Sequence, residues 1–169
     1  NIITADVFKD SGGNTLFESN GSGVLSNVNS GLKGNLVFIS SQTETDADSI
    51  SFTSGIDSTY DVYIFKFIEI HPDTNGGLFS FQANVAGGSG FNEALTSTWF
   101  HARHTETDSV AQLSYGASYD QALGTAYQGL SYDGQNNADD CLCGNLIVFN
   151  PSSTTYVKNW YCEVNEVIR

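Results

Sequence analysis

The sequence predicts an all-β protein, in the form of a two-sheet antiparallel sandwich of the jelly-roll type preceded by a short β stalk. Residues 60–70 give the strongest indication, because almost every position is β-branched or aromatic. Further strand candidates recur at intervals typical of all-β domains. Apolar residues never repeat at helical spacing over three turns. An immunoglobulin-like sandwich is the second choice.

The segment 60–70 carries apolar side chains on both faces of the expected strand. One face holds Tyr63, Phe65 and Phe67, and the other holds Val62, Ile64, Ile68 and Ile70. Turn-forming residues bound the segment at 55–59 and 71–77. A strand of this kind must be covered twice, so we expect a central strand whose second face meets another subunit. Val62, Ile64 and Ile68 are the predicted subunit-interface residues.

The domain organisation predicted from the sequence is a stalk followed by a head. Residues 1–33 read as an extended β stalk or linker, with strands within 7–19 and 24–28 separated by Gly- and Asn-rich turns. So small a segment needs copies of itself or a neighbour for stability. Residues 34–169 form the β-sandwich head, and their long last strand candidate lacks a partner hairpin, so we expect further sequence beyond it. The strand candidates of the head are 36–41, 49–53, 60–70, 78–85, 95–104, 110–115, 125–132, 142–149 and 155–167.

Composition limits the classes of function. The chain has 169 residues, enough for one principal core, and 19 acidic against 6 basic residues give a net charge of -13. This charge argues against binding to nucleic acid or to an anionic membrane surface. No stretch approaches the roughly 20 consecutive apolar residues of a membrane helix, so we expect a soluble protein without membrane insertion. Cys141, Cys143 and Cys162 cannot all pair within one chain, so reduced, buried thiols and assembly in a cytoplasm are expected.

Catalytic and metal-binding patterns are weak. His101 and His104 would point to opposite faces of a strand, and Cys141 with Cys143 lacks a second ligand pair at zinc-site spacing. The acidic segment 133–140 lacks the Gly and closing Glu of the helix-loop-helix calcium motif. No nucleophile elbow and no phosphate-binding glycine motif occurs. The sequence predicts no enzyme, no metal and no cofactor.

Aromatic residues in Gly-, Ser- and Asn-rich surroundings are the remaining signal. Flat rings beside amide and hydroxyl groups suit a saccharide or a protein partner. An alternative is that most of these rings belong to the core or to a subunit interface. The predicted binding residues are Phe91, Asn92, Tyr115, Tyr119 and Tyr132.

Four segments in a fixed order resemble virion structural proteins of marine tailed phages, which are tail-fibre-like. These segments are 50–60, 64–67 with the following His71-Pro72, 90–93 and, above all, the Phe-Asn-Pro-Ser-Ser-Thr-Thr-Tyr-Val-Lys run at 149–158. The similarity covers about residues 36–160. Pieces of residues 9–25 look like the short β-stalk repeats that precede such domains.

The resemblance implies a homotrimeric, jelly-roll-like head on a fibre, spike or capsid protrusion of a virion assembled in the host cytoplasm. Its partners would be other virion proteins and a host-surface glycan or protein, held by many weak sites acting together. A capsid decoration or cement protein is the alternative. A polysaccharide depolymerase is disfavoured, because no short β-helix repeat is present. No catalytic residue is implied.

Overall fold

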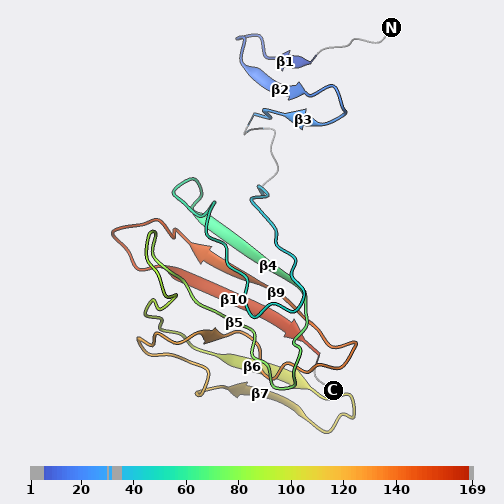
Figure 1. Cartoon of the computed structure of the whole chain (residues 1–169), viewed down its shortest axis with the longest axis vertical. Helices are drawn as coiled ribbons and strands as arrows, with labels where there is room; N and C mark the ends of the chain where they lie inside the picture. The colour runs from blue at the N-terminus through green and yellow to red at the C-terminus, as the bar shows by residue number, and fades with distance from the viewer. Residues whose placement is uncertain (1–5, 30, 32–35, 168–169) are drawn as a thin grey trace. The chain divides into compact units, whose positions relative to one another are not determined.

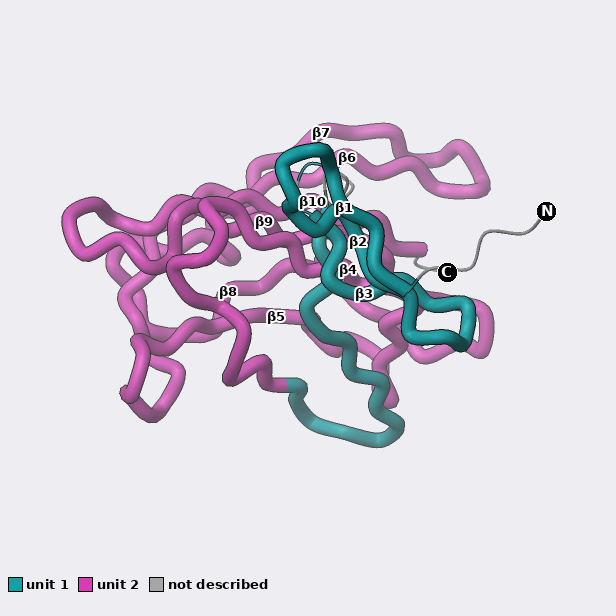
Figure 2. Tube along the Cα trace, turned by 90° about the horizontal axis from the view of Figure 1, so that it is seen from above, with its two compact units in different colours: residues 1–50 teal, residues 51–169 magenta. Residues whose placement is uncertain are grey.

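The computed structural model describes residues 6–29, 31 and 36–167, and every regular element in this part of the chain is a β strand (Figure 1). The strands form four small antiparallel sheets, and no α-helix occurs among the described residues. The all-β prediction is confirmed. The chain divides into two compact units, Asn1–Ile50 and Ser51–Arg169 (Figure 2).

The first unit contains a three-stranded sheet of order β1-β2-β3. Its strands are β1 (Val7–Lys9), β2 (Thr15–Ser19) and β3 (Leu25–Ser26). The first turn forms because Asp10 Oδ1 accepts hydrogen bonds from the backbone N–H groups of Gly12 and Asn14, both at 2.9 Å. Phe8 and Phe17 stack across the first two strands, with ring centroids 4.5 Å apart. The strands predicted within 7–19 and 24–28 are therefore present.

The second unit is built on a three-stranded antiparallel sheet of order β10-β9-β4. Its strands are β4 (Val62–Ile70), β9 (Leu142–Phe149) and β10 (Asn159–Glu166). The prediction that residues 60–70 form a central strand is wrong here, because β9 is central and β4 lies at the edge. Apolar side chains on both faces of a strand indicate that both faces are covered. They do not indicate whether the strand has a hydrogen-bonded neighbour along each of its two edges.

One side of this sheet, which we call the inner face, holds the core. Tyr63, Leu142 and Leu146 are buried there, and Tyr63 is only 4% exposed. The register places them on one face together with Phe65, Phe67, Trp160 and Cys162. Edge-on aromatic contacts cover this face, with centroid distances of 4.8–5.6 Å: Phe52 with Phe65, Phe67 with Phe79, and Phe81 with Trp160.

A β-bulge near the end of β4 changes which face its last residue occupies. The register shifts between Phe67 and Ile70, and Glu69 has a positive φ of 54°. Ile70 then pairs with Leu142, so it shares the inner face. The prediction that Ile70 lies on the side of Ile64 is wrong, because the extra residue of the bulge reverses the alternation.

Two two-stranded sheets complete the regular structure of the second unit, and only the second of them is a hairpin. The first pairs β5 (Ser80–Phe81) with β8 (Gln128–Gly129), and the second pairs β6 (Phe100–His104) with β7 (Ala111–Tyr115). The strands predicted at 78–85 and 125–132 are much shorter than expected. Side-chain hydrogen bonds replace ladder bonds there: Gln82 Nε2 donates to backbone carbonyls of Glu93, Thr125 and Ala126 at 3.1–3.2 Å.

The predicted strands at 36–41 and 49–53 are absent from the structure. Residues 36–41 are exposed and lie outside any sheet, with Leu36 67% and Phe38 79% exposed. A β strand needs a neighbour to accept and donate its ladder hydrogen bonds, and the described part of the chain supplies none to this segment. The strand propensity of these two segments therefore does not by itself place them in a sheet.

Candidate functional site

The side of the three-stranded sheet opposite the core, which we call the outer face, exposes apolar side chains among polar ones. Its polar members are Lys66, Asn145, Asn159, Glu163 and Asn165. The register aligns Val62 with Phe149, and Ile64 with Ile147 and then Tyr161. Ile64 is 40% exposed, Tyr161 54% and Ile68 71%. All three predicted interface residues, Val62, Ile64 and Ile68, lie exposed on this outer face. Their role as an interface stays a prediction.

The second unit buries few apolar side chains and leaves many large ones exposed. The only apolar side chains buried among the described residues are Tyr63, Leu95, Leu130, Leu142 and Leu146. Exposed large apolar side chains outnumber these, and on the outer face they include Val62, Ile64, Ile68, Phe149 and Tyr161. Large apolar surfaces left open in this way mark sites of association.

The predicted binding residues Tyr119 and Tyr132 belong to an internal aromatic cluster. Trp99 stacks on Tyr119 with centroids 4.6 Å apart, and His101 packs on Tyr132 at 4.5 Å. The Tyr119 hydroxyl donates to the Tyr132 carbonyl at 3.1 Å, and burial raises the pKa of Tyr119. Arg103 lies over the Tyr132 ring at 5.9 Å. The hydroxyl and rings of this cluster are engaged in contacts within the chain.

Tyr115 lies elsewhere, on an open face of the β6–β7 hairpin. It is 59% exposed and pairs across the strands with Phe100, while Leu113 lies on the same face and pairs with Ala102. The Tyr115 hydroxyl donates to Asp120, and this bond raises the pKa of Tyr115. Phe100, Leu113 and Tyr115 together form what we call the hairpin face. Leu113 was missed by the sequence reasoning, although the alternation of Ala111, Leu113 and Tyr115 carries the signal.

These positions predict different effects of mutation on stability. Tyr119→Ala and Tyr132→Ala each remove ring contacts in the cluster, so we expect each to lower the unfolding free energy by about 3 kcal/mol. Tyr115→Ala removes an exposed ring and should change it by less than about 1 kcal/mol. Urea denaturation of the three variants measures these values. Equal losses in all three would contradict the assignment of Tyr115 to an open surface.

Phe91 and Asn92 lie in the loop between β5 and β6. Phe91 is half-buried with a positive φ of 45°, and Asn92 is exposed. Among the described residues, no hydrogen bond or ring contact joins either of them to Tyr115, Tyr119 or Tyr132. The five predicted binding residues therefore lie in at least three separate places and do not form one site.

Glu166, in the last described strand, secures the chain near Tyr132. Its Oε1 accepts the Tyr132 backbone N–H at 2.7 Å. Burial raises the pKa of Glu166 above its ordinary 4.5, and this effect outweighs the lowering by hydrogen bonds from the Tyr132 and Asp133 backbones. The folded state therefore disfavours the charged form of Glu166 relative to the unfolded chain.

The raised pKa of Glu166 predicts that the stability of the fold depends on pH. Because the folded pKa is the higher one, the folded state binds the Glu166 proton more tightly, and stability from this group is lost as pH rises from about 4.5 through the folded pKa. Glu166→Gln keeps the acceptor oxygen and removes the charge. We expect the melting temperature of the variant to fall less than that of the wild type between pH 4 and 7. Parallel curves would contradict this account.

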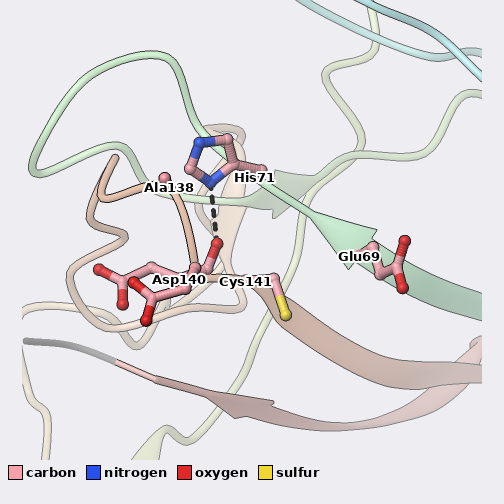
Figure 3. A pocket seen from close by; sticks show the side chains of 6 residues that line it. Glu69, His71, Ala138, Asp140 and Cys141 are labelled. Carbon is pink, nitrogen blue, oxygen red and sulfur yellow. Dashed lines mark hydrogen bonds between the residues drawn. The ribbon is translucent and has the colours of Figure 1, made fainter.

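An open pocket of about 370 Å³ lies beside the β4 bulge, lined by Glu69, His71, Ala138, Asp139, Asp140 and Cys141 (Figure 3). His71 Nδ1 lies 2.9 Å from the Asp140 carbonyl oxygen. Burial is the main cause that raises the pKa of the Cys141 thiol, which disfavours a reactive thiolate. Within the described residues, no three His, Cys, Asp or Glu side chains form a group that could hold a metal ion.

The three cysteines are free. Cys141 and Cys162 are half-buried, and burial raises the pKa of Cys162 to about 11. The prediction of buried thiols is wrong for Cys143, which is exposed on the outer face and accepts the Glu69 N–H at 3.4 Å. Alternation along β9 puts Cys143 on the opposite side from the buried Leu142.

Comparisons with known proteins give no relative: no family model, no curated protein and no solved structure matches the chain. In the part of the chain that the structure describes, no helix is long and apolar enough to cross a membrane.

Proposed function

We propose that this chain is a structural component of a phage virion that associates with copies of itself through the outer face of the β10-β9-β4 sheet. The observation that carries this proposal is the exposure of Val62, Ile64 and Ile68 on the outer face, in a row that also holds Lys66, opposite a well-covered inner face. Apolar side chains on a sheet face that water reaches are stabilised when a second surface covers them.

The proposed assembly is a homotrimer with a jelly-roll-like sandwich, in which residues 1–33 serve as the stalk. The number three and the sandwich come from the resemblance to tail-fibre-like virion proteins. The exposed apolar side chains of the outer face support self-association, because the buried centre of a subunit interface is enriched in apolar and aromatic residues. The net charge of -13 keeps assembled particles apart in solution.

Host-surface adhesion is the role that we propose for the assembled protein, with the hairpin face as its contact. Phe100 and Tyr115 offer open rings, and the Asp120 carboxylate beside Tyr115 adds a hydrogen-bond acceptor. Rings beside polar groups suit the apolar and hydroxyl faces of a saccharide. Three copies on each fibre would multiply weak contacts into useful avidity.

Cryo-electron microscopy of the intact particle tests location. Density for this chain at the distal end of a fibre or spike would support adhesion, and density lying across capsomer junctions would favour the cement alternative.

Binding of the purified oligomer to host cells tests whether the hairpin face is the contact. Tyr115→Ala should weaken binding, whereas Tyr156→Ala, at an exposed ring of the 150–158 loop, is the matched control. Binding unchanged by Tyr115→Ala would contradict the hairpin face as the contact.

A further inference from the structure

The outer face of the β10-β9-β4 sheet carries one cation and one carboxylate among its paired positions. Lys66 of β4 is aligned with Asn145 of β9, and Asn145 is aligned with Glu163 of β10. Among the described strands, β4 and β10 form the two edges of this sheet (Figure 1). A single row across the strands therefore has a positive charge at one edge and a negative charge at the other.

Both charged side chains are exposed, and neither forms an ion pair within the described part of the chain. The Lys66 ammonium donates a hydrogen bond to Asn145 Oδ1 at 3.3 Å, and the Tyr161 hydroxyl donates to a Glu163 carboxylate oxygen at 3.5 Å. Because neighbouring strands lie about 4.8 Å apart, the backbones at Lys66 and Glu163 are separated by about 10 Å, with Asn145 between them. Each charge is therefore open to a counter-ion on a second surface.

The positions of the two charges favour contact between unlike edges of two copies. Two β4 edges brought together would place Lys66 against Lys66, and two β10 edges would place Glu163 against Glu163, which is unfavourable. A β4 edge against a β10 edge instead brings opposite charges together. The neighbouring row agrees, because the same contact places Ile64 of one copy beside Tyr161 of the next, and both side chains are exposed in the single chain.

Contacts between unlike edges can close into a ring when the symmetry axis runs along the strands. Rotation about such an axis keeps every row at its own level, so the row of Lys66 in one copy lies level with the row of Glu163 in the next. The contact is heterologous, and it gives a closed ring when the rotation between copies divides a full turn. Three sheets with their outer faces turned toward the axis meet this condition, and they cover the apolar rows of one another.

We propose that Lys66 of one copy forms an ion pair with Glu163 of the next copy around the oligomer. The inference rests on the proposed homo-oligomer and names the contact that determines which edges of its sheets meet. Opposite charges placed across an interface suppress the wrong pairing of surfaces and fix the register of the right one. The apolar side chains of the outer face would supply association, and this ion pair would supply its direction.

A zero-length crosslink on the unmodified chain tests the contact directly. A carbodiimide joins a lysine amine to a carboxylate where the two groups touch, and a denaturing gel then separates products by the number of chains joined. We expect a two-chain product that contains a peptide in which Lys66 is linked to Glu163. Lys66→Gln should reduce the two-chain product at least tenfold. Lys158→Gln removes an exposed lysine of the 150–158 loop and is the matched control, which should keep the product.

Charge reversal provides a second measurement, with the dissociation constant of the oligomer determined by sedimentation. Lys66→Glu and Glu163→Lys each place like charges at the contact, so each should raise the dissociation constant tenfold or more. The chain that carries both substitutions has opposite charges again and should return to within threefold of the unmodified chain. Lys9→Glu makes the same change of charge as Lys66→Glu at an exposed site of the first unit, and it should also stay within threefold.

Each contrary result has a distinct meaning. A linked peptide of Lys66 and Glu163 recovered only from single chains would overturn the contact between copies. A stable oligomer that neither charge reversal weakens would overturn the ion pair and leave the proposed oligomer standing. A double variant as weak as the single variants would also overturn the ion pair, because the losses would then have another origin. A monomer in the unmodified protein would overturn the proposed oligomer itself.

Discussion

Replacing Ile64 by glutamate is expected to dissociate the oligomer into folded monomers. Ile64 lies on the outer face, at the β4 end of a cross-strand row with Ile147 and Tyr161. Its side chain is open to solvent in the single chain. A carboxylate at this position stays hydrated in the monomer but becomes buried without a partner in the oligomer. The cost is on the order of 3 kcal/mol, which raises the dissociation constant by roughly a hundredfold.

Light scattering coupled to size-exclusion chromatography measures this effect. We expect Ile64→Glu to elute with the mass of one 18.2 kDa chain and with the circular-dichroism spectrum of β structure. Leu123→Glu is the matched control, because Leu123 is exposed in a loop outside the β10-β9-β4 sheet. An Ile64→Glu variant that assembles as tightly as the wild type would show that the outer face is not the interface.

Replacing Gly144 by alanine is expected to produce a large loss of stability. Gly144 lies in the central strand β9 opposite Val164 of β10. A Cβ at Gly144 would overlap the Glu163 carbonyl oxygen and lie 2.8 Å from the Val164 Cα. Backbone atoms cannot move aside as a side chain can, so the two strands must separate locally. We expect the unfolding free energy to fall by about 3 kcal/mol, the upper part of the range for overpacking.

Thermal unfolding by circular dichroism measures the consequence. For a chain of this length, 3 kcal/mol corresponds to a decrease in Tm of roughly 6–12 °C. Asn145→Ala is the control in the next position, where the side chain points to the outer face and its Oδ1 accepts a hydrogen bond from Lys66 Nζ at 3.3 Å. Its Tm should change by less than about 2 °C. Equal Tm values for the two variants would contradict the close approach of β9 and β10.

The sequence correctly predicted the strands whose side chains pack on the core. It failed where the outcome depends on which strands pair with one another. Residues 62–70 and 142–149 are strands as expected, because the aromatic side chains of β4 and the leucine side chains of β9 pack on the inner face. The sequence placed residues 60–70 at the centre of a sheet, since face periodicity contains no information about edges. The sequence also predicted strands at 36–41 and 49–53. These residues have a high strand propensity, but no described strand pairs with them.

The candidate sites were predicted in part, for reasons of chemistry. Tyr115, Tyr119 and Tyr132 carry the same functional group in similar Gly- and Ser-rich surroundings, so sequence could not separate the exposed ring from the two clustered ones. That separation depends on Trp99, which stacks on Tyr119 only after the chain folds back. The outer-face residues were found because alternation along a single strand is a local property.

Sedimentation equilibrium of the unmodified chain over a wide range of concentrations tests the central claim most directly, because it measures assembly without any mutation. The account predicts a mass of three copies of the 18.2 kDa chain, or a monomer–trimer equilibrium that shifts with concentration. A mass of 18.2 kDa at every concentration would contradict it, because the outer face would then remain exposed in the protein as it functions.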